Sequence, residues 1–273
     1  MYPDILVHFD GSERATARLD LAIRLVLRRG GRRLTGIFAR IDPDERGIIA
    51  RRASARLVEA ASRAEATFRQ TCAGHGLGCD WLNMPFGDPD FIIREMVICS
   101  RYSDLTVLGQ FDPEHDRDIL PPELNEEIVR QSGGPVLLVP FAGSFASIGR
   151  SVLVAWNGSR EAARAVRDAM PFLTAAAEVR VLGLHLRPEQ PDRDLPRINI
   201  AERLRRNGID AAYDVIAPNE VGTMDMILSH AADAGADLLV MGAFGTDAVP
   251  GFGRAAGTRF ILGHMTIPVL MSH

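Results

Sequence analysis

The chain reads Ile5-Leu6-Val7-His8-Phe9-Asp10-Gly11-Ser12 near its start and Val152-Leu153-Val154-Ala155-Trp156-Asn157-Gly158-Ser159 147 residues later. Each copy is an apolar run closed by Asp/Asn-Gly-Ser and followed by apolar residues at helical spacing, which predicts a strand, a turn and a helix. Residues 104–140 also match 237–273 at a constant offset of 133, with Asp-Leu-x-Val-x-Gly and Pro-Val-Leu in register. We therefore expect two related domains, over residues 1–141 and 150–273, joined by a Gly/Ser-containing linker.

Strands and helices are expected to alternate in both halves. The expected strands are 4–9, 33–39, 79–84, 104–109 and 135–139, then 151–156, 179–186, 211–216, 237–241 and 267–271. The expected helices are 13–28, 47–73, 89–100 and 122–131, then one starting near 162, followed by 195–207, 224–234 and a short one at 259–263. This alternation predicts an α/β fold with two tandem, doubly wound, five-stranded parallel sheets of strand order 3-2-1-4-5, each covered by helices on both faces.

Composition narrows the function classes. The 273 residues are 47% hydrophobic and 24% charged, with a net charge of -4, which argues against a nucleic-acid binder. The sequence has no stretch of eighteen apolar residues and no signal-peptide pattern at its start, so we expect no membrane association and a cytoplasmic location. The three cysteines lack CxxC spacing, so neither a disulfide framework nor a zinc site is indicated.

The candidate ligand site lies in the second half. In open parallel sheets, ligands collect beyond the carboxyl ends of the strands where the strand order reverses, here at the loops after the first and fourth strands. One loop is Asn157-Gly158-Ser159, and the other runs from Gly242 through Gly245 to Gly257-Thr258 at a helix start. Glycines let backbone amides approach an anion, and a helix N-terminus supplies unpaired N–H groups. This arrangement suits a phosphate.

These motifs resemble the universal stress protein family, whose fold is adenine nucleotide alpha hydrolase-like, and the resemblance covers nearly the whole chain twice. Nucleotide-binding members have Gly-x2-Gly-x9-Gly-Ser/Thr and a carboxylate at the end of strand one. The resemblance implies that ATP or another adenine nucleotide, with which Mg could bind, lies in the second half. The residues it assigns to the nucleotide are Ala155, Asn157, Leu186, Met241, Gly242, Gly245, Gly257 and Thr258, with Arg254 and Arg259 as further phosphate contacts.

Two departures from the family pattern are visible in the second half. Eleven residues separate Gly245 from Gly257 where the family has nine, and Asn157 replaces the carboxylate. The first half shows the opposite pattern, because it keeps Asp10 but has Asp112 and Leu124 where the second half has Gly245 and Gly257. Its acidic loop, 111–118, would repel a triphosphate, so we expect no ATP there.

Structural alternatives remain open for these residues. The glycines and Thr258 are also typical turn and capping residues, and Asp10 is interpreted as a turn cap. His8 and His185 are interpreted as structural, and the other histidines give no metal-ligand pattern. The chain has no Gly-x-Ser-x-Gly or Walker A motif, so at most slow ATP hydrolysis is expected.

Three functional hypotheses follow. The first is a stress-response regulatory module that binds an adenine nucleotide in its second half and changes its contacts with protein partners, which the sequence does not identify. The second is a nucleotide-independent scaffold with vestigial sites, and the third is a weak ATPase. The resemblance also implies an intramolecular pseudo-dimer, in which residues 136–139 face 269–271, and allows a homodimer of whole chains.

Overall fold

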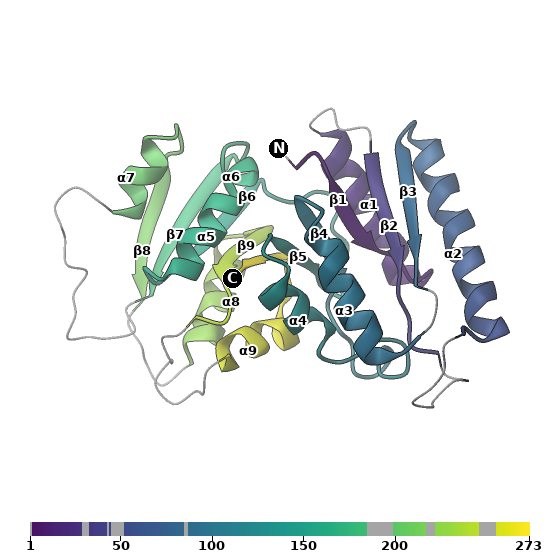
Figure 1. Ribbon diagram of the computed structural model, residues 1–273. Helices are drawn as coiled ribbons and strands as arrows, with labels where there is room; N and C mark the ends of the chain where they lie inside the picture. The colour runs from purple at the N-terminus through teal and green to yellow at the C-terminus, as the bar shows by residue number, and fades with distance from the viewer. Residues whose placement is uncertain are drawn as a thin grey trace. The chain divides into compact units, whose positions relative to one another are not determined.

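The chain divides into two compact units, Met1–Ala146 and Ser147–His273. The computed structural model describes residues 2–28, 33–42, 44, 52–84, 87–184, 199–216, 222–245 and 255–273. Residues 147–150, which the sequence assigned to the linker, group with the second unit. Figure 1 shows the first unit in purple to teal and the second in green to yellow.

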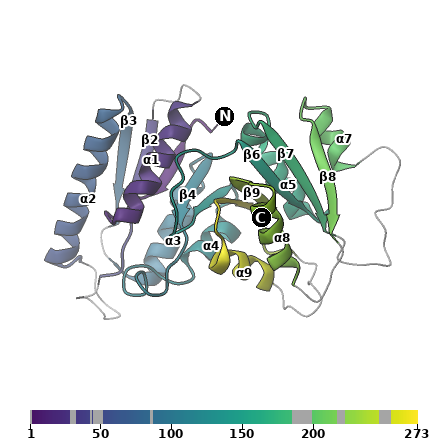
Figure 2. The same cartoon turned by 180° about the vertical axis from the view of Figure 1, so that it is seen from behind.

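The first unit is a three-layer α/β structure. Within the described residues its five parallel strands have the order β3-β2-β1-β4-β5. The strands are β1 (Ile5–His8), β2 (Arg33–Phe38), β3 (Gly78–Asn83), β4 (Leu105–Gly109) and β5 (Val136–Val139). The helices are α1 (Glu13–Leu27), α2 (Ala55–Gly74), α3 (Pro89–Ser100) and α4 (Leu124–Gln131). Right-handed crossovers place α1 and α2 on one face of the sheet and α3 and α4 on the other (Figures 1 and 2).

The second unit repeats this plan. Its five parallel strands, counted over the described residues, have the order β10-β9-β6-β7-β8, which is again 3-2-1-4-5 when read from β8. The strands are β6 (Ser151–Trp156), β7 (Glu178–Leu184), β8 (Ala211–Ile216), β9 (Leu238–Gly242) and β10 (Val269–Ser272). The helices are α5 (Arg160–Asp168), α6 (Met170–Leu173), α7 (Ile200–Arg205), α8 (Thr223–Asp233) and α9 (Ala256–His264). The predicted fold class is confirmed.

Several helix boundaries differ from prediction. Helix α2 begins at Ala55, not near residue 47, because the Ser54 hydroxyl accepts the Leu57 N–H at 3.1 Å and caps the helix there. The first helix of the second unit is interrupted, because α5 ends at Asp168 and Pro171 lies in the first turn of a separate helix, α6. Helix α9 is longer than predicted and starts before Gly257.

The repeated Asp-Leu-x-Val-x-Gly motif has a structural role at its aspartate. In the second unit the Asp237 carboxylate accepts the N–H groups of Gly149, Arg150 and Ser151 at 2.9 to 3.1 Å. In the first unit Asp104 accepts the N–H of Asp4 at 3.0 Å. A carboxylate before the fourth strand thus holds the backbone that leads into the first strand in both copies.

Aromatic side chains fill the space between the first unit's sheet and α2. The Phe68 ring packs against Phe9 and Trp81, with ring centroids 5.9 and 5.1 Å apart. Gly36 of β2 makes room for them, since a Cβ atom there would lie 2.7 Å from the Phe68 ring. A large apolar core therefore fixes α2 over β2 and β3.

Candidate functional site

The carboxyl ends of β6 and β9 are adjacent where the strand order of the second unit reverses. The last paired residues there, Ala155 and Met241, are both buried. Gly242 follows directly against the first turn of α5, where a Cβ atom would lie 2.5 Å from the backbone of Glu161 and Ala162. Gly242 is therefore required for this close approach. Ala155 and Met241 lie at the strand ends where open parallel sheets form their ligand crevice.

The Asn157-Gly158-Ser159 segment forms a turn that leads into α5. The Asn157 side-chain oxygen accepts the Ser159 N–H at 3.1 Å, Gly158 has a φ of +75°, and the Ser159 hydroxyl accepts the Ala162 N–H at 3.1 Å. Asp10 makes the same turn in the first unit. The role shared by the two motifs is thus to shape the strand-to-helix turn, and either an amide or a carboxylate oxygen fulfils it.

Strained backbone borders the segment between β9 and α9. Phe244 and Ala255 both have positive φ, 54° and 71°, which L residues rarely adopt. The Phe244 N–H donates to the Thr258 hydroxyl at 2.9 Å, and this links the exit of β9 to the first turn of α9. Gly257 lies beside Met224 of α8. The Met224 Cε atom is 3.0 Å from the position that a Cβ atom of Gly257 would occupy. Such strain concentrates at ligand sites, and the Thr258 hydroxyl retains a proton to donate.

A buried carboxylate, Glu161, also lies at this crevice. Its side chain is only 2% exposed, and Oε1 accepts a hydrogen bond from Arg160. Oε2 is buried, and no described residue forms a hydrogen bond with it. Oε2 lies 3.6 Å from the position that a Cβ atom of Gly245 would occupy. Burial alone would raise the pKa of Glu161, but the hydrogen bond from Arg160 helps to hold it below its ordinary value. The Glu161 N–H and the Ser159 hydroxyl also help to lower this pKa, but Oε2 itself has no hydrogen-bond partner among the described residues.

The first unit has an ion pair at the two corresponding positions. Arg14 corresponds to Glu161 and Asp112 to Gly245 in the repeat, and the Arg14 guanidinium lies 2.5 Å from the Asp112 carboxylate. In the first unit, the two side chains neutralise each other across the crevice. In the second unit, Glu161 takes the position of the arginine and Gly245 takes that of the aspartate. No ion pair can therefore form between these two positions.

The buried side chain of Arg18 fills the crevice of the first unit. Its Nε donates to the His8 carbonyl oxygen at 2.9 Å, and one terminal nitrogen lies 4.0 Å from the Asp10 carboxylate. A Cβ atom on Gly109 would lie 2.2 Å from Arg18, so the guanidinium rests on the exit of β4. The cavity that remains is about 30 Å³, room for about one water molecule. The second unit has Ala165 at the position of Arg18, which leaves its crevice unfilled by this residue.

The buried charges around Arg18 have shifted pKa values. Burial lowers the pKa of His8 to about 4, and Arg18 and Arg40 add to this effect against the opposing influence of Asp10. Burial opposes ionisation of Asp10, but Arg18 and the hydrogen bonds from Ser12 bring its pKa down to about 2. At neutral pH the first crevice therefore contains a neutral imidazole and an Asp10–Arg18 pair.

The acidic loop of the first unit is held by its own hydrogen bonds. Asp112 accepts from Arg14 and from the Glu114 N–H, and its own N–H donates to Asp116 at 2.8 Å. His115 contacts the Asp112 carboxylate at 2.9 Å. The carboxylates thus have specific hydrogen-bond partners within the loop, and the repulsion of a triphosphate stays a prediction.

Two kinds of feature are missing from the part of the chain that the structure describes. No three His, Cys, Asp or Glu side chains gather there as ligands for a metal ion. In the same residues, no helix combines the length and the apolar character needed to cross a membrane.

The comparisons with known proteins identify the fold. No family model matches the chain, and no curated protein does. Among solved structures, a universal stress protein from Archaeoglobus fulgidus DSM 4304 matches with a TM-score of 0.73 and 18% identity, over 99% of this chain and 98% of that one. A functionally unknown protein from Pseudomonas aeruginosa PAO1 matches with a TM-score of 0.60 and 17% identity, over 99% and 92%. The chain has the universal stress protein fold.

The structure gathers only part of the nucleotide site that the resemblance to universal stress proteins implies. Ala155, Asn157, Met241, Gly242 and Gly245 lie around one crevice of this universal stress protein fold. Leu186 and Arg254 lie outside the described residues, so their predicted contacts stay predictions.

On α9, Thr258 is buried and holds the exit of β9, and Gly257 packs on α8. Arg259 is exposed on the same helix. Glu161 was missed, although comparison of Arg14 with Glu161 in the repeat could have found it.

Proposed function

We propose that the chain is a stress-response regulatory protein of the universal stress protein family, in which the second unit binds an adenine nucleotide, ATP, ADP or AMP. One observation carries this proposal: the buried Glu161 Oε2, where the sheet order reverses, has no hydrogen-bond partner among the residues that the structure describes. A buried, ionised acceptor without a donor costs about 1 to 3 kcal/mol or more, and a bound ligand with hydroxyl groups would recover that cost.

Glu161 suits the nucleoside end of such a ligand. Its carboxylate would repel phosphates, but it can accept hydrogen bonds from the ribose hydroxyl groups. It would thereby take the role of the carboxylate that universal stress proteins have at the end of the first strand, where this chain has Asn157. The phosphates would then lie away from Glu161, toward the start of α9, where backbone N–H groups and the Thr258 hydroxyl can donate. A magnesium ion could accompany the phosphates.

The first unit would take a structural role in this proposal. Arg18 occupies its crevice and the Arg14–Asp112 ion pair closes the rim. Nucleotide binding would change the segment between β9 and α9 and thereby the contacts with protein partners in the cytoplasm. The pairing of residues 136–139 with 269–271 and the homodimer stay predictions.

A specific observation favours the competing function, a nucleotide-independent scaffold. The negative charge of Glu161 lies within the crevice that would receive a polyanion. If this repulsion outweighs the hydrogen bonds to the nucleotide, both sites are vestigial. The protein would then function only by binding protein partners at its surface.

Calorimetric titration of the chain with ATP, ADP and AMP separates these two functions. Gly245→Asp copies the first unit and places a carboxylate beside Glu161; Gly245→Asn is its neutral control of the same shape. A carboxylate about 5 Å from a phosphate of the nucleotide repels it by about 3 kcal/mol at an effective dielectric constant of about 20, so the Asp variant should lose roughly a hundredfold in affinity.

One nucleotide per chain, lost in the Asp variant and retained in the Asn variant, is the expected result. Absence of binding at millimolar nucleotide would reject the proposal in favour of the scaffold. Phosphate release over hours, measured on the same samples, tests whether any hydrolysis accompanies binding.

A further inference from the structure

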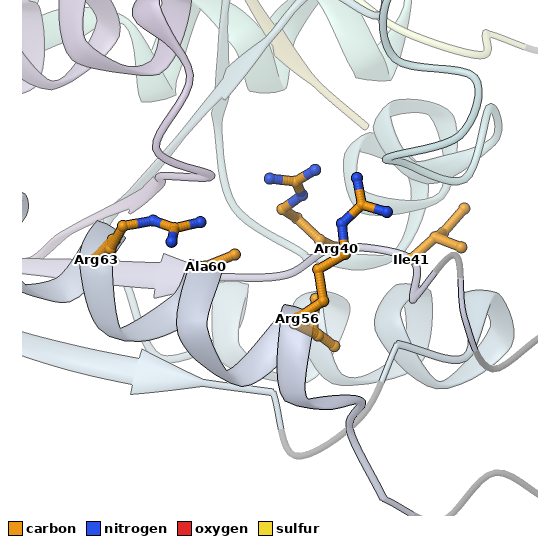
Figure 3. Close-up of a pocket in the computed structure, with 6 residues that line it drawn as sticks. Arg40, Ile41, Arg56, Ala60 and Arg63 are labelled. Atoms are coloured by element: carbon orange, nitrogen blue, oxygen red, sulfur yellow. The ribbon is translucent and has the colours of Figure 1, made fainter.

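A second pocket, in the first unit, is lined by three arginines. It lies between the exit of β2 and the N-terminal half of α2 and has a volume of about 160 Å³. Its lining residues are Arg40, Ile41, Arg56, Leu57, Ala60 and Arg63. Figure 3 shows the guanidinium groups of Arg40, Arg56 and Arg63 on the same side of α2. The pocket is separate from the crevice that Arg18 fills, with which it shares no lining residue.

Within the described residues, carboxylates balance only part of the positive charge of this pocket. Among the residues that the structure describes, neither Arg40 nor Arg56 has a carboxylate within 4 Å, and the buried Nε of Arg40 has no hydrogen-bond partner. Arg63 pairs with Glu59, one turn earlier on α2, but both side chains are more than 60% exposed. Such an exposed pair is weak, so Arg63 remains able to turn toward a ligand.

Asp42, an acidic residue at the exit of β2, already accepts hydrogen bonds from other residues. Asp42 is buried, and its carboxylate accepts the Ser54 N–H at 2.7 Å, the Ser54 hydroxyl at 2.8 Å and the Asp44 N–H at 3.2 Å. These bonds link the exit of β2 to the residue that caps α2. Burial opposes ionisation of Asp42, but its hydrogen bonds and, to the smallest extent, the charge of Arg56 lower its pKa. Asp42 therefore fixes the pocket and acts on Arg56 only at a distance, since no ion pair within 4 Å joins these two described residues.

The backbone that carries Arg40 is also held in place. The Ile41 N–H donates to the Ile119 carbonyl oxygen at 2.7 Å, and the Asp42 N–H donates to the Gly87 carbonyl oxygen at 3.2 Å. Gly87 allows this approach, because a Cβ atom there would lie 2.2 Å from the Asp42 nitrogen. The pocket is thus preformed, and binding would cost little backbone ordering.

The geometry points to an anion site that receives the phosphate group of a small phosphorylated metabolite. Guanidinium groups bind phosphate oxygens through paired N–H donors, and the N-terminal turns of α2 add positive potential on the same side. A volume of about 160 Å³ equals that of about five water molecules, enough for one or two phosphate groups but not for a whole nucleotide. The inference does not rest on nucleotide binding by the second unit.

The test uses pyrophosphate and ribose 5-phosphate as probes, with acetate as the carboxylate control. Calorimetry is performed on the full chain in the Gly245→Asp background, so that a second-unit site does not contribute. Arg40→Gln and Arg56→Gln remove the unpaired guanidinium groups, and Arg69→Gln, an exposed position farther along α2, is the matched control. Circular dichroism and urea unfolding confirm that each variant is folded.

We expect at least one phosphate compound to bind more tightly than acetate, with affinity at least tenfold weaker in Arg40→Gln and in Arg56→Gln and unchanged in Arg69→Gln. Preference for pyrophosphate would assign a diphosphate group, and preference for ribose 5-phosphate a phosphomonoester. No binding at millimolar concentration, equal binding of acetate, or equal loss in the Arg69→Gln control would overturn the inference.

Discussion

Acid should destabilise the first unit through one buried side chain, His8. The terminal nitrogens of Arg18 can only donate, and one lies 3.5 Å from the His8 Nδ1, so Nδ1 is the unprotonated nitrogen. His8 Nε2 therefore carries the proton and donates to the Ala39 carbonyl oxygen at 3.0 Å. The site is buried, and a second proton on Nδ1 would face the guanidinium, which explains why the pKa of His8 is low.

The magnitude follows from the two pKa values. The pKa is 6.5 for an ordinary histidine and about 4 for His8 in the folded chain. Between these values the unfolded state binds more protons, so stability falls as pH falls and no effect is present above pH 6.5. At about 1.4 kcal/mol per pH unit, the free energy of unfolding should decrease by about 2 kcal/mol at pH 5 and about 3 kcal/mol at pH 4.

Fluorescence can follow the first unit alone. The chain has two tryptophans, and Trp156→Phe leaves only Trp81, which packs in the aromatic core of the first unit. Urea unfolding is then measured in this background at pH 7.5 and pH 5, with His8 and with His8→Gln, whose side chain does not titrate. Because both proteins share every other titratable group, the His8 protein should lose about 2 kcal/mol more than the variant. Equal losses in the two proteins would refute the reasoning.

Four further substitutions test the second unit. Gly242→Ala should lower the free energy of unfolding by about 1 to 3 kcal/mol, because its Cβ atom would lie 2.5 Å from α5. Gly245→Ala has room for a Cβ atom and should change the free energy of unfolding little. Urea unfolding of the two variants tests this difference. Asp237→Ala should cost about 2 to 3 kcal/mol in the same assay, since three backbone N–H groups lose their acceptor. Glu161→Gln should weaken adenosine and AMP binding, each by roughly tenfold, and a gain in affinity confined to AMP would place Glu161 at the phosphate instead.

The sequence sufficed for the fold because the same signals occur twice. Each Asp/Asn-Gly-Ser turn ends an apolar strand and caps a helix, and the observed hydrogen bonds of Asp10 and Asn157 are nearly identical. The predicted start of α2 was wrong, because the helical spacing of apolar residues says little about where a helix begins. Ser54 decides that start through its cap.

The site was less predictable because it depends on what side chains do after folding. Arg18 lies among Ala15, Leu19 and Ala22 on the buried stripe of α1, and a charged residue in that pattern indicates a special role. Its partners, however, come from β1 and the exit of β4. Glu161 looked like an ordinary acid in the first turn of a helix, and its burial became visible only in the structure.

A crystal structure of the chain soaked with ATP tests the central claim most directly. The account predicts density for one nucleotide in the second unit, with its ribose on Glu161 and its base and phosphates on either side of Gly242. A second unit without a nucleotide at saturating ATP, or a nucleotide bound in the first unit in place of the Arg18 side chain, would contradict it.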